Sequence, residues 1–515
     1  MTNIVVCFID PILKIGGMSP YYQVFLAGLK NAGNQVLAFI RNKAYIEEEI
    51  IAGIPESLLL KLKDFNPDLF IIFNNQFYDV SKYFDVPIIV YDVDNPKRIS
   101  NEKRLKKNDR YRYLTIQKAN VQLICDLMEC HDLRVEYIPP FTGVTADDSV
   151  KRDINIAFCG DPCATTAFNQ IKNFLLLNPD NYERQAAKEI YNEFIKAPFY
   201  PADELYDRLK IKANKRINFG DNTVFLINIS GIKRMRHLSV VTDLGLEIRG
   251  QNWLNPSCLS MTFPELLFSY SSEPVNDLAT TTVFYNRAKI GININNIQAW
   301  SGFSWRVADV MASNACLISD PAKDFANLGF DVPCFTSPAE AHDICENLLR
   351  DDNWRADLVA KNHEIINKNH RFINVLPIIE DVAGISLQSA NTAGTLEVVR
   401  IESPALPKAD RTKEMQSIDK KLSNMVNNEK AVINEIGKIK NHLQKTVVNP
   451  EQNIRENRLR FVYDHICYYR IQRGRFWLCK SLSWGKRRDK YRMKYKAVRD
   501  LIREARIFYR DLWRD

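Results

Sequence analysis

The sequence predicts an α/β protein with two doubly wound domains that face a cleft, followed by a helical C-terminal part. Short apolar runs of strand length alternate with helical patterns along the first 385 residues. Twice such a strand leads into a glycine-containing turn, first near Gly16 and again near Gly160. A chain of 515 residues is also longer than one hydrophobic core serves, because domains cluster around about 100 to 200 residues.

The first domain is expected to span residues 1–150. It begins with a strand, a glycine turn, a helix and a second strand, and Pro139 and Pro140 end its last strand before a polar linker. Near-continuous Val, Ile and Leu strands are typical of parallel sheets covered on both faces. The expected strands are 4–9, 35–40, 69–73, 88–91 and 135–138, and the expected first helix is 21–32.

The second domain is expected to span residues 151–385 and to repeat this organisation. Its predicted strands are 154–159, 224–229, 246–249, 289–294 and 315–319. Residues 164–215 are helical in pattern, polar and rich in aromatic residues, and the sequence assigns them no role.

Beyond the second domain the composition changes twice. Residues 386–411 form a predicted linker, because they are rich in Ser, Thr, Ala and Pro and show no periodicity. Residues 412–447 carry apolar side chains at alternating spacings of four and three from Ile418 to Leu443, broken only by Glu429. This pattern predicts a coiled-coil helix and a homo-oligomer. A single amphipathic helix packed on its own domain is the alternative.

The last predicted segment, residues 452–515, is a basic helical tail rich in aromatic residues. It holds 19 Lys or Arg against 7 Asp or Glu, in a chain whose net charge is +8. Trp477 and Trp484 stand beside the cluster Lys486, Arg487 and Arg488. Aromatic anchors next to cations fit an anionic membrane surface. Packing against the two domains is an alternative, and nucleic-acid binding is disfavoured.

Composition argues against several classes of protein. No apolar run approaches the roughly 18 residues of a spanning helix, and the first residues lead directly into a strand without a cationic leader. We therefore expect a cytoplasmic protein, peripheral at the inner face of the membrane. Most of the 11 cysteines lie in apolar segments, and Cys159 and Cys163 have no second ligand pair nearby, so we expect neither disulfides nor a zinc site.

The segment after residue 300 has the pattern of a phosphate-binding helix. Its predicted start at Ser301 and Gly302 would direct free N–H groups and the positive end of the helix dipole out of the turn. Arg306, one turn inside, would add a cation for a diphosphate. Asp309 would accept hydrogen bonds from vicinal ribose hydroxyls. The alternative is that Arg306 and Asp309 form a surface ion pair three residues apart.

Other candidate residues lie at the ends of predicted strands. Asp92, Asp94 and, after the first strand, Asp10 are candidate general bases, and helix capping is the alternative role for each. Gly16 and Gly17 would let an acceptor approach the backbone closely, unless they form only a tight turn. His131, His237 and His370 have no partner in sequence and are expected to be structural.

A family resemblance supports the phosphate-binding interpretation. The run Asn-Arg-Ala-Lys-Ile-Gly at 286–291, followed by Gly-Phe-Ser at 302–304 and by a helix that holds Arg306 and Asp309, resembles GT-B glycosyltransferases. The similarity is strongest to the CgeB-like branch of glycosyl transferases group 1, and it extends more weakly over residues 1–384. It implies two Rossmann-like domains. The donor-binding candidates are then Tyr285, Ser301, Gly302, Phe303, Ser304, Arg306 and Asp309, with Lys233 and Arg234 as further cations.

Two positions depart from the family pattern. Retaining members often carry two glutamates with seven residues between them, and these positions correspond to Ser301 and Asp309. The glycine of the family that follows the helix corresponds to Asn314.

The resemblance implies a glycosyltransferase. We expect it to use neither a metal ion nor a cofactor, because Asp92-Val93-Asp94, in the acceptor half, is the only match to an Asp-x-Asp motif. The enzyme would move a sugar from a nucleoside-diphosphate sugar to a glycan or lipid-linked acceptor in cell-surface polysaccharide biosynthesis. A sugar-nucleotide epimerase of the same fold and a non-catalytic scaffold that binds a nucleotide sugar are the alternatives.

Overall fold

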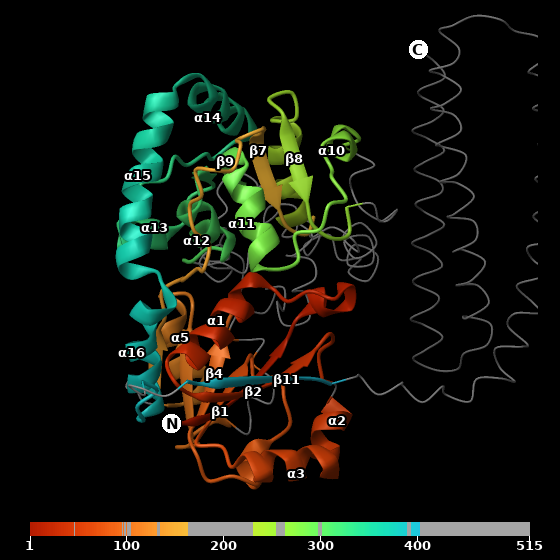
Figure 1. Ribbon diagram of the computed structural model, residues 1–515, viewed down its shortest axis with the longest axis vertical. Coiled ribbons are helices and arrows are strands. Elements are labelled where there is room, and N and C mark those ends of the chain that lie inside the picture. Colours follow the sequence, from red (N-terminus) through yellow and green to blue (C-terminus); the bar gives the residue numbers. More distant parts are fainter. Residues whose placement is uncertain are drawn as a thin grey trace, which may run out of the picture. The chain divides into compact units, whose positions relative to one another are not determined.

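Two parallel β-sheets organise the protein in its computed structural model (Figure 1). The structure describes residues 1–45, 47–94, 96, 99, 105–130, 134–162, 230–253, 263–296, 301–388 and 393–401. These residues belong to one unit of the chain, Met1–Phe174 with Asp180–Ser403. The predicted strand 224–229, the region 164–215, the coiled-coil segment 412–447 and the tail 452–515 lie outside the described residues.

The larger sheet belongs to lobe 1, the name used here for this sheet and its helices. Its strand order is β11-β2-β1-β3-β4-β5-β6, and every neighbouring pair is parallel. The strands are β1 (Asn3–Ile9), β2 (Gln35–Arg41), β3 (Leu69–Phe73), β4 (Ile88–Asp92), β5 (Tyr111–Thr115), β6 (Val135–Tyr137) and β11 (Thr395–Arg400). The helices are η1 (Pro11–Ile15), α1 (Pro20–Asn31), α2 (Glu47–Ala52), α3 (Glu56–Phe65), η2 (Val80–Lys82), α5 (Asn120–Met128) and α16 (Phe372–Ala383).

Lobe 2 contains the smaller sheet, whose order is β10-β9-β7-β8, again with parallel pairs. Its strands are β7 (Ile154–Cys159), β8 (Leu246–Arg249), β9 (Ala288–Asn293) and β10 (Cys316–Ser319). Its helices are α10 (Glu265–Phe268), α11 (Leu278–Asn286), α12 (Arg306–Ala312), α13 (Lys323–Leu328), α14 (Pro338–Arg350) and α15 (Asp352–Asn369).

Both faces of the lobe 1 sheet are covered, as the apolar strands predict. All residues of β3 and β4 are buried, because helices pack on each side of the sheet. One hydrophobic cluster contains side chains of α1 and α16, and the other contains side chains of α2, α3 and α5. The predicted α/β class with parallel sheets is therefore confirmed. No helix in the described ranges has the length and apolar character needed to cross a membrane.

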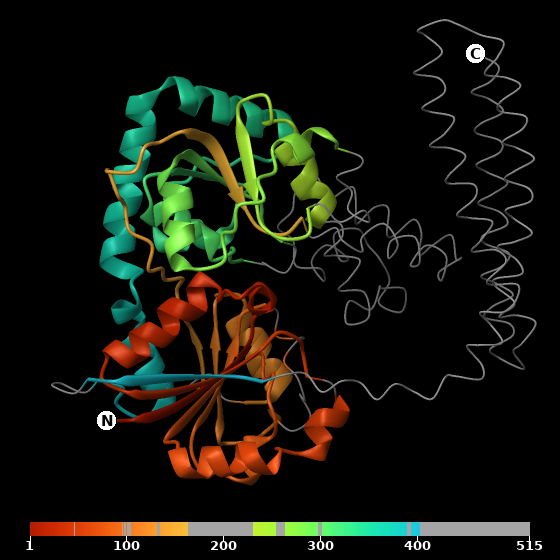
Figure 2. The same ribbon diagram turned by 45° about the vertical axis from the view of Figure 1, so that its right-hand side comes forward.

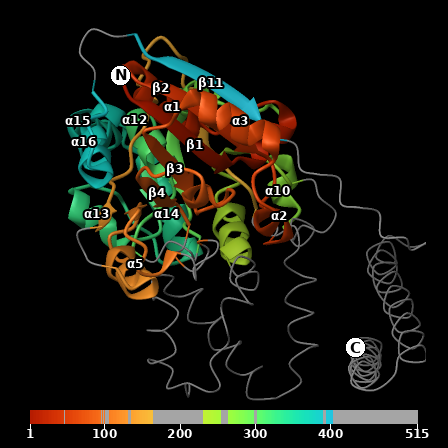
Figure 3. The ribbon, with the colours of Figure 1, turned by 90° about the horizontal axis from the view of Figure 1, so that it is seen from below.

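The last two described elements, α16 and β11, belong to lobe 1 and not to the segments in which the sequence analysis placed them. Helix α16, expected in the second domain, buries Phe372, Val375 and Ile379 in the lobe 1 core. Strand β11 falls in the predicted linker 386–411, yet it extends the lobe 1 sheet beside β2 (Figures 2 and 3). Strand β11 could not be predicted from the sequence, because nearly all of its side chains are exposed and so show no burial pattern.

Candidate functional site

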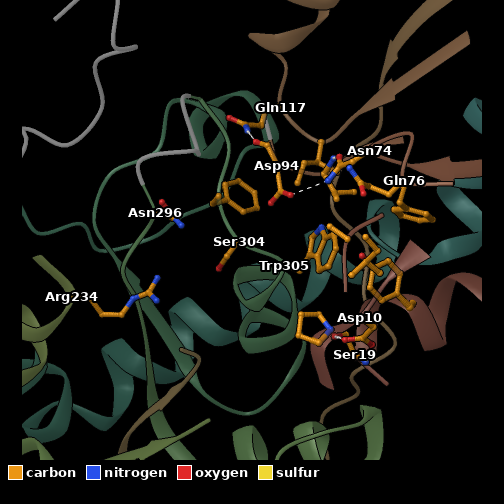
Figure 4. A pocket seen from close by; sticks show the side chains of 18 residues that line it. Asp10, Ser19, Asn74, Gln76, Asp94, Gln117, Arg234, Asn296, Ser304 and Trp305 are labelled. Carbon is orange, nitrogen blue, oxygen red and sulfur yellow. Dashed lines mark hydrogen bonds between the residues drawn. The ribbon is translucent and has the colours of Figure 1, made fainter. Parts of the chain in front are cut away.

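A cavity of about 740 Å³ lies where the carboxyl ends of the lobe 1 strands meet lobe 2. Lobe 1 contributes residues that follow β1, β3, β4 and β5, and lobe 2 contributes Arg234, Asn296 and the loop before α12 (Figure 4). The strand order reverses between β1 and β3, and such switch points are the usual ligand sites of open α/β sheets. The polar lining residues are Asp10, Ser19, Asn74, Gln76, Asp94, Gln117, Arg234, Asn296 and Ser304, and aromatic faces come from Tyr22, Phe73, Phe303 and Trp305.

Among the three candidate bases, Asp94 lies in the cavity wall with its carboxylate held by a neighbour. Asn74 Nδ2 donates to Asp94 Oδ2 at 2.9 Å. The same amide is fixed in turn, because Val93 N–H donates to Asn74 Oδ1 at 3.0 Å. Asn74 has a φ of 50°, a left-handed conformation that asparagine tolerates better than most residues.

Asp92 is fully buried and does not line the cavity. Its Oδ2 accepts hydrogen bonds from Thr115 Oγ1 at 2.8 Å and from Asn120 Nδ2 at 3.0 Å, so the carboxyl group joins β4 to β5 and α5. Burial raises the pKa of Asp92 to about 6, although these hydrogen bonds oppose the rise.

Asp10 lines the cavity, but its carboxylate serves as a cap, the alternative that the sequence left open. It accepts hydrogen bonds from Ile12 N–H at 3.1 Å, from Ser19 N–H at 2.6 Å and from Ser19 Oγ at 2.9 Å. These contacts fix η1 and the start of α1 at the cavity edge.

The two glycines of the first turn do not line the cavity, contrary to the expected acceptor contact. Gly16 ends η1 with a φ of 82°. Gly17 faces lobe 2, where a Cβ would lie 2.4 Å from the carbonyl oxygen of Asn276. Met18 N–H donates to that oxygen at 3.0 Å. Because Gly17 has no side chain, the backbone of lobe 2 at Asn276 can pack directly against it.

The predicted helix start at Ser301 is wrong, because α12 begins at Arg306. Contacts hold Ser301 in a loop: its Oγ donates to Asp324 Oδ2 at 3.0 Å and its carbonyl oxygen accepts from Asp324 N–H at 2.9 Å. Ser301 N–H donates to Gln117 Oε1 of lobe 1 at 3.4 Å. Loop 301–305, as we call residues 301–305, therefore runs along lobe 1 and presents Phe303, Ser304 and Trp305 to the cavity.

Arg306 is directed into lobe 2 and is not a lining residue. Its Nε donates to the carbonyl oxygen of Cys159 at 2.5 Å, and its Nη1 donates to Asn293 Oδ1 at 3.0 Å. Its guanidinium lies 4.5 Å from the ring centre of Phe158. Tyr285 is buried next to it, and burial raises the pKa of the phenol well above its ordinary value.

Asp309 also lies away from the cavity lining. Its Oδ1 accepts a hydrogen bond from Thr142 Oγ1, at 2.6 Å, in the segment that connects β6 to β7. Burial raises the pKa of Asp309 to about 6, and the positive charges of Arg306 and Arg371 oppose the rise.

The two adjacent cations of the preceding helical segment, residues 230–239, differ in position. Lys233 and Asp320 form an ion pair in which both side chains are 1% exposed, and burial lowers the pKa of Lys233. Arg234 lines the cavity, where its guanidinium donates to the carbonyl oxygens of Asp161 and Ile294. Only Arg234 of this pair is therefore presented to a ligand.

Several lining residues carry no sequence signal strong enough to single them out. Trp305 stacks on Tyr21 of α1 with ring centres 3.7 Å apart and an interplanar angle of 3°, so it joins the lobes at the cavity. Asn74 and Gln76 follow a fully buried strand, at the end of a parallel sheet where ligand contacts usually lie, and this position in the sequence was the one available signal. Gln117 and Asn296 follow strands in the same way.

Two of the three histidines considered in the sequence are described, and each contacts a backbone carbonyl oxygen. His237 Nδ1 lies 2.8 Å from the Lys233 carbonyl oxygen, and burial lowers its pKa to about 4. His370 Nδ1 lies 2.7 Å from the Pro140 carbonyl oxygen, while His131 and Cys163 lie outside the described residues. Within the described ranges no three His, Cys, Asp or Glu side chains gather as a metal site would require.

Comparison with known proteins gives one family match. Residues 236–380, which include loop 301–305 and α12, match the family described as Glycosyl transferase-like. No curated protein matches the chain.

Several solved structures are similar to this chain at low identity. WaaG, a glycosyltransferase involved in lipopolysaccharide biosynthesis, has 8% identity, covers 74% of this chain and 100% of its own, and gives a TM-score of 0.40. The spinosyn rhamnosyltransferase SpnG has 11% identity over 74% of this chain and 100% of its own, with a TM-score of 0.37. A putative UDP-N-acetylglucosamine 2-epimerase from Listeria monocytogenes has 7% identity over 76% and 99%, with a TM-score of 0.35. The CgeB-like branch stays a prediction.

Proposed function

We propose that this chain, whose residues 236–380 form a Glycosyl transferase-like domain, transfers a sugar from a nucleoside-diphosphate sugar to a glycan or lipid-linked acceptor. One observation carries the proposal. Loop 301–305, which belongs to the matched segment, forms the cavity wall in lobe 2, and Asp94 lies in the wall that lobe 1 contributes. A cavity between two lobes suits a reaction that joins two substrates. We place this transfer in cell-surface polysaccharide biosynthesis, where glycan and lipid-linked acceptors occur.

The donor would lie on the lobe 2 side. Arg234 supports this orientation, because a planar guanidinium matches the oxygens of a diphosphate and lines the cavity. Its contacts with two backbone carbonyl oxygens hold it in place before a ligand arrives. We propose that Arg234, rather than a metal ion or cofactor, neutralises the charge that develops on the leaving diphosphate. Arg306, Lys233 and Asp309 would stabilise the fold of lobe 2 and would not contact the donor.

The acceptor would lie on the lobe 1 side, with Asp94 as general base. The acceptor hydroxyl loses its proton to the Asp94 carboxylate while its oxygen bonds to the anomeric carbon of the donor sugar. The bond between that carbon and the diphosphate oxygen breaks, and its electron pair leaves with the nucleoside diphosphate. This single displacement inverts the configuration at the anomeric carbon.

The remaining lining residues suit sugar rings. Tyr22, Phe73, Phe303 and Trp305 offer flat apolar faces, and Asn74, Gln76 and Asn296 offer amide groups that both donate and accept hydrogen bonds. A mixture of aromatic surface and a few placed polar groups is characteristic of small-molecule sites.

A donor screen tests the proposal. Thermal unfolding is measured with sugars linked to UDP, GDP, CMP and dTDP, because a ligand at 100 times its Kd adds about 2.7 kcal/mol to stability. The stabilising donor is then incubated with and without glycan acceptors, and the products are separated. Transfer to an acceptor supports the proposal. Conversion of the donor alone would identify an epimerase, and tight binding without turnover would identify a scaffold.

We further propose that residues 412–447 form an oligomer and that residues 452–515 bind an anionic membrane surface from the cytoplasmic side. Both proposals rest on the sequence patterns, since neither segment is described. Light scattering of the full chain and of a variant without residues 412–447 tests the first: an unchanged mass contradicts it. Flotation with anionic vesicles, with and without residues after Pro450, tests the second: equal recovery in the soluble fraction contradicts it.

A further inference from the structure

Gln117 links the two walls of the cavity through a single amide group. It follows β5, is 3% exposed and lines the cavity (Figure 4). Its Nε2 donates to the carbonyl oxygen of Asp94 at 3.0 Å. Its Oε1 accepts from Ser301 N–H, at 3.4 Å, at the start of loop 301–305.

The contact between Gln117 and the loop leaves little room for displacement. A Cβ on Gly302 would lie 2.9 Å from Gln117 Cγ and 3.3 Å from the carbonyl oxygen of Ile116. Contacts closer than about 3.4 Å force one partner to move, so only glycine lets the loop sit this close. Ser301 is fixed from a second direction, because Ala119 N–H donates to its Oγ at 3.2 Å. Loop 301–305 is thus seated against lobe 1 at one defined place.

Two further described contacts of Asp94 come from lobe 1. Asn74 Nδ2 donates to the Asp94 carboxylate, and the Asp94 N–H donates to Asp92 Oδ1 at 3.4 Å. The hydrogen bonds of Gln117 connect Ser301, at the start of loop 301–305, to the backbone of Asp94. The amide of Gln117 can donate to a carbonyl oxygen and accept from an N–H group at once, whereas a carboxylate cannot donate and an alkyl chain can do neither.

We infer that Gln117 is a positioning residue that makes the placement of Asp94 depend on the seating of loop 301–305. The inference rests on the proposed function, in which Asp94 is the base and the loop belongs to the donor side. Its consequence is that the base reaches its working position only when the two lobes are in contact at the loop. Displacement of a reacting group by about 1 Å can cost about a hundredfold in rate, so a contact of this kind is sufficient to control turnover.

The first experiment needs no donor, so its failure is separate from failure of the proposed function. Backbone hydrogen exchange is followed in peptides that cover residues 91–94 and 301–305 of the full chain. Gln117→Met should speed exchange in both peptides about fivefold, the effect of losing one neutral hydrogen bond. Gln122→Met, on the exposed face of α5, is the matched control and should change neither peptide.

A double-mutant cycle then tests dependence rather than proximity. Gly302→Ala should push the loop away and speed exchange at 91–94, but it should have no further effect in the Gln117→Met background. Ser301→Ala, which removes the bonds to Asp324 and Ala119, provides a milder displacement if Gly302→Ala fails to fold. Unchanged exchange at 91–94 in both loop variants, or additive effects with Gln117→Met, would overturn the inference.

Kinetics distinguish positioning from substrate contact, since Gln117 also lines the cavity. With the donor identified by the screen, Gln117→Met should lower kcat about tenfold or more while the donor and acceptor KM stay within about twofold. Gln117→Glu should lower kcat at least as far, because a carboxylate cannot donate to the Asp94 carbonyl oxygen. A raised KM with unchanged kcat would make Gln117 a binding residue and overturn the inference.

Discussion

Thr142 Oγ1 donates a hydrogen bond of 2.6 Å to Asp309 Oδ1. Thr142 lies in the segment that leads from lobe 1 into lobe 2, and Asp309 lies on α12. Arg371, where the chain returns to lobe 1, donates to the carbonyl oxygens of Thr142 and Val144. The carboxyl group of Asp309 therefore sits beside both passages of the chain between the lobes.

This position predicts a pH-dependent contribution of Asp309 to stability. Burial raises its pKa from 3.8 to about 6, so between these values the folded protein keeps a proton that the unfolded chain has lost. The group therefore supports the folded state most at low pH, and this support disappears as the pH rises through 6. The pKa difference corresponds to roughly 3 kcal/mol at most, and partial solvent contact lowers the expected effect to about 1 to 2 kcal/mol.

Asp309→Asn measures this contribution, because the amide oxygen can still accept from Thr142. Thermal midpoints are compared with wild type at pH 5 and pH 7.5. The variant should gain stability relative to wild type at the higher pH, whereas Asp357→Asn, on the exposed side of α15, should not. A variant that is equally stable relative to wild type at both pH values would show that Asp309 has no raised pKa.

The elements that were predictable from sequence are those whose burial leaves a pattern. Strands β3, β7 and β8 have the predicted bounds. Strand β3 is an unbroken apolar run, and β7 and β8 each place apolar side chains in the core of lobe 2. Strand β5 was not among the predicted strands, since Tyr111, Arg112 and Thr115 break its apolar run. Strand β11 was also missed because its side chains are exposed.

The site was predictable only in part, because contacts between distant residues determine which side chains reach the cavity. Asp94 and Arg234 line it as their positions in sequence suggest. Arg306 does not, since the end of β7 and Asn293 provide its hydrogen-bond acceptors. Helix propensity places a helix start at Ser301, but the contacts with Gln117 and Asp324 are tertiary and leave no local signal.

The placement of α16 on lobe 1 leads to a prediction at Gly28. A Cβ on Gly28 would lie 2.1 Å from Phe372 Cδ1, although Gly28 is inside α1, where alanine is normally favoured by about 0.5 to 1 kcal/mol. Gly28→Ala should instead destabilise the protein by about 1 to 3 kcal/mol through overpacking. The shift of the thermal or urea midpoint measures the effect.

Phe372→Ala provides the matching control. In this background the clash is absent, so Gly28→Ala should be neutral or stabilising even though Phe372→Ala itself costs stability. Equal destabilisation by Gly28→Ala in both backgrounds would contradict the packing of α16 against α1.

Arg234 and Arg306 of lobe 2 should differ in their effect on a nucleotide ligand. Arg234 lines the cavity and Arg306 does not, so Arg234→Met should weaken binding of the stabilising nucleotide about tenfold or more. Arg306→Met should mainly lower stability, because it removes one donor from the Cys159 carbonyl oxygen and one from Asn293 Oδ1, which still accepts from Ser304 Oγ. Titration calorimetry and thermal unfolding of both variants separate the two effects. A larger loss of affinity in Arg306→Met would instead support the sequence prediction for that residue.

Asp94→Asn tests the proposed base directly. The amide is nearly isosteric but cannot take a proton from the acceptor, and general-base catalysis contributes about 10² to 10⁴ in rate. We expect kcat to fall by a factor in that range while donor affinity, measured by titration calorimetry, stays near the wild-type value.

Asp85→Asn is the matched control, because Asp85 pairs with Arg110 on the surface and its side chain is 91% exposed. Since Asp92 is buried and bonded to Thr115 and Asn120, it is not placed to substitute for Asp94. Turnover in Asp94→Asn at the wild-type rate would therefore remove the base from the proposed mechanism and leave the donor assignment standing.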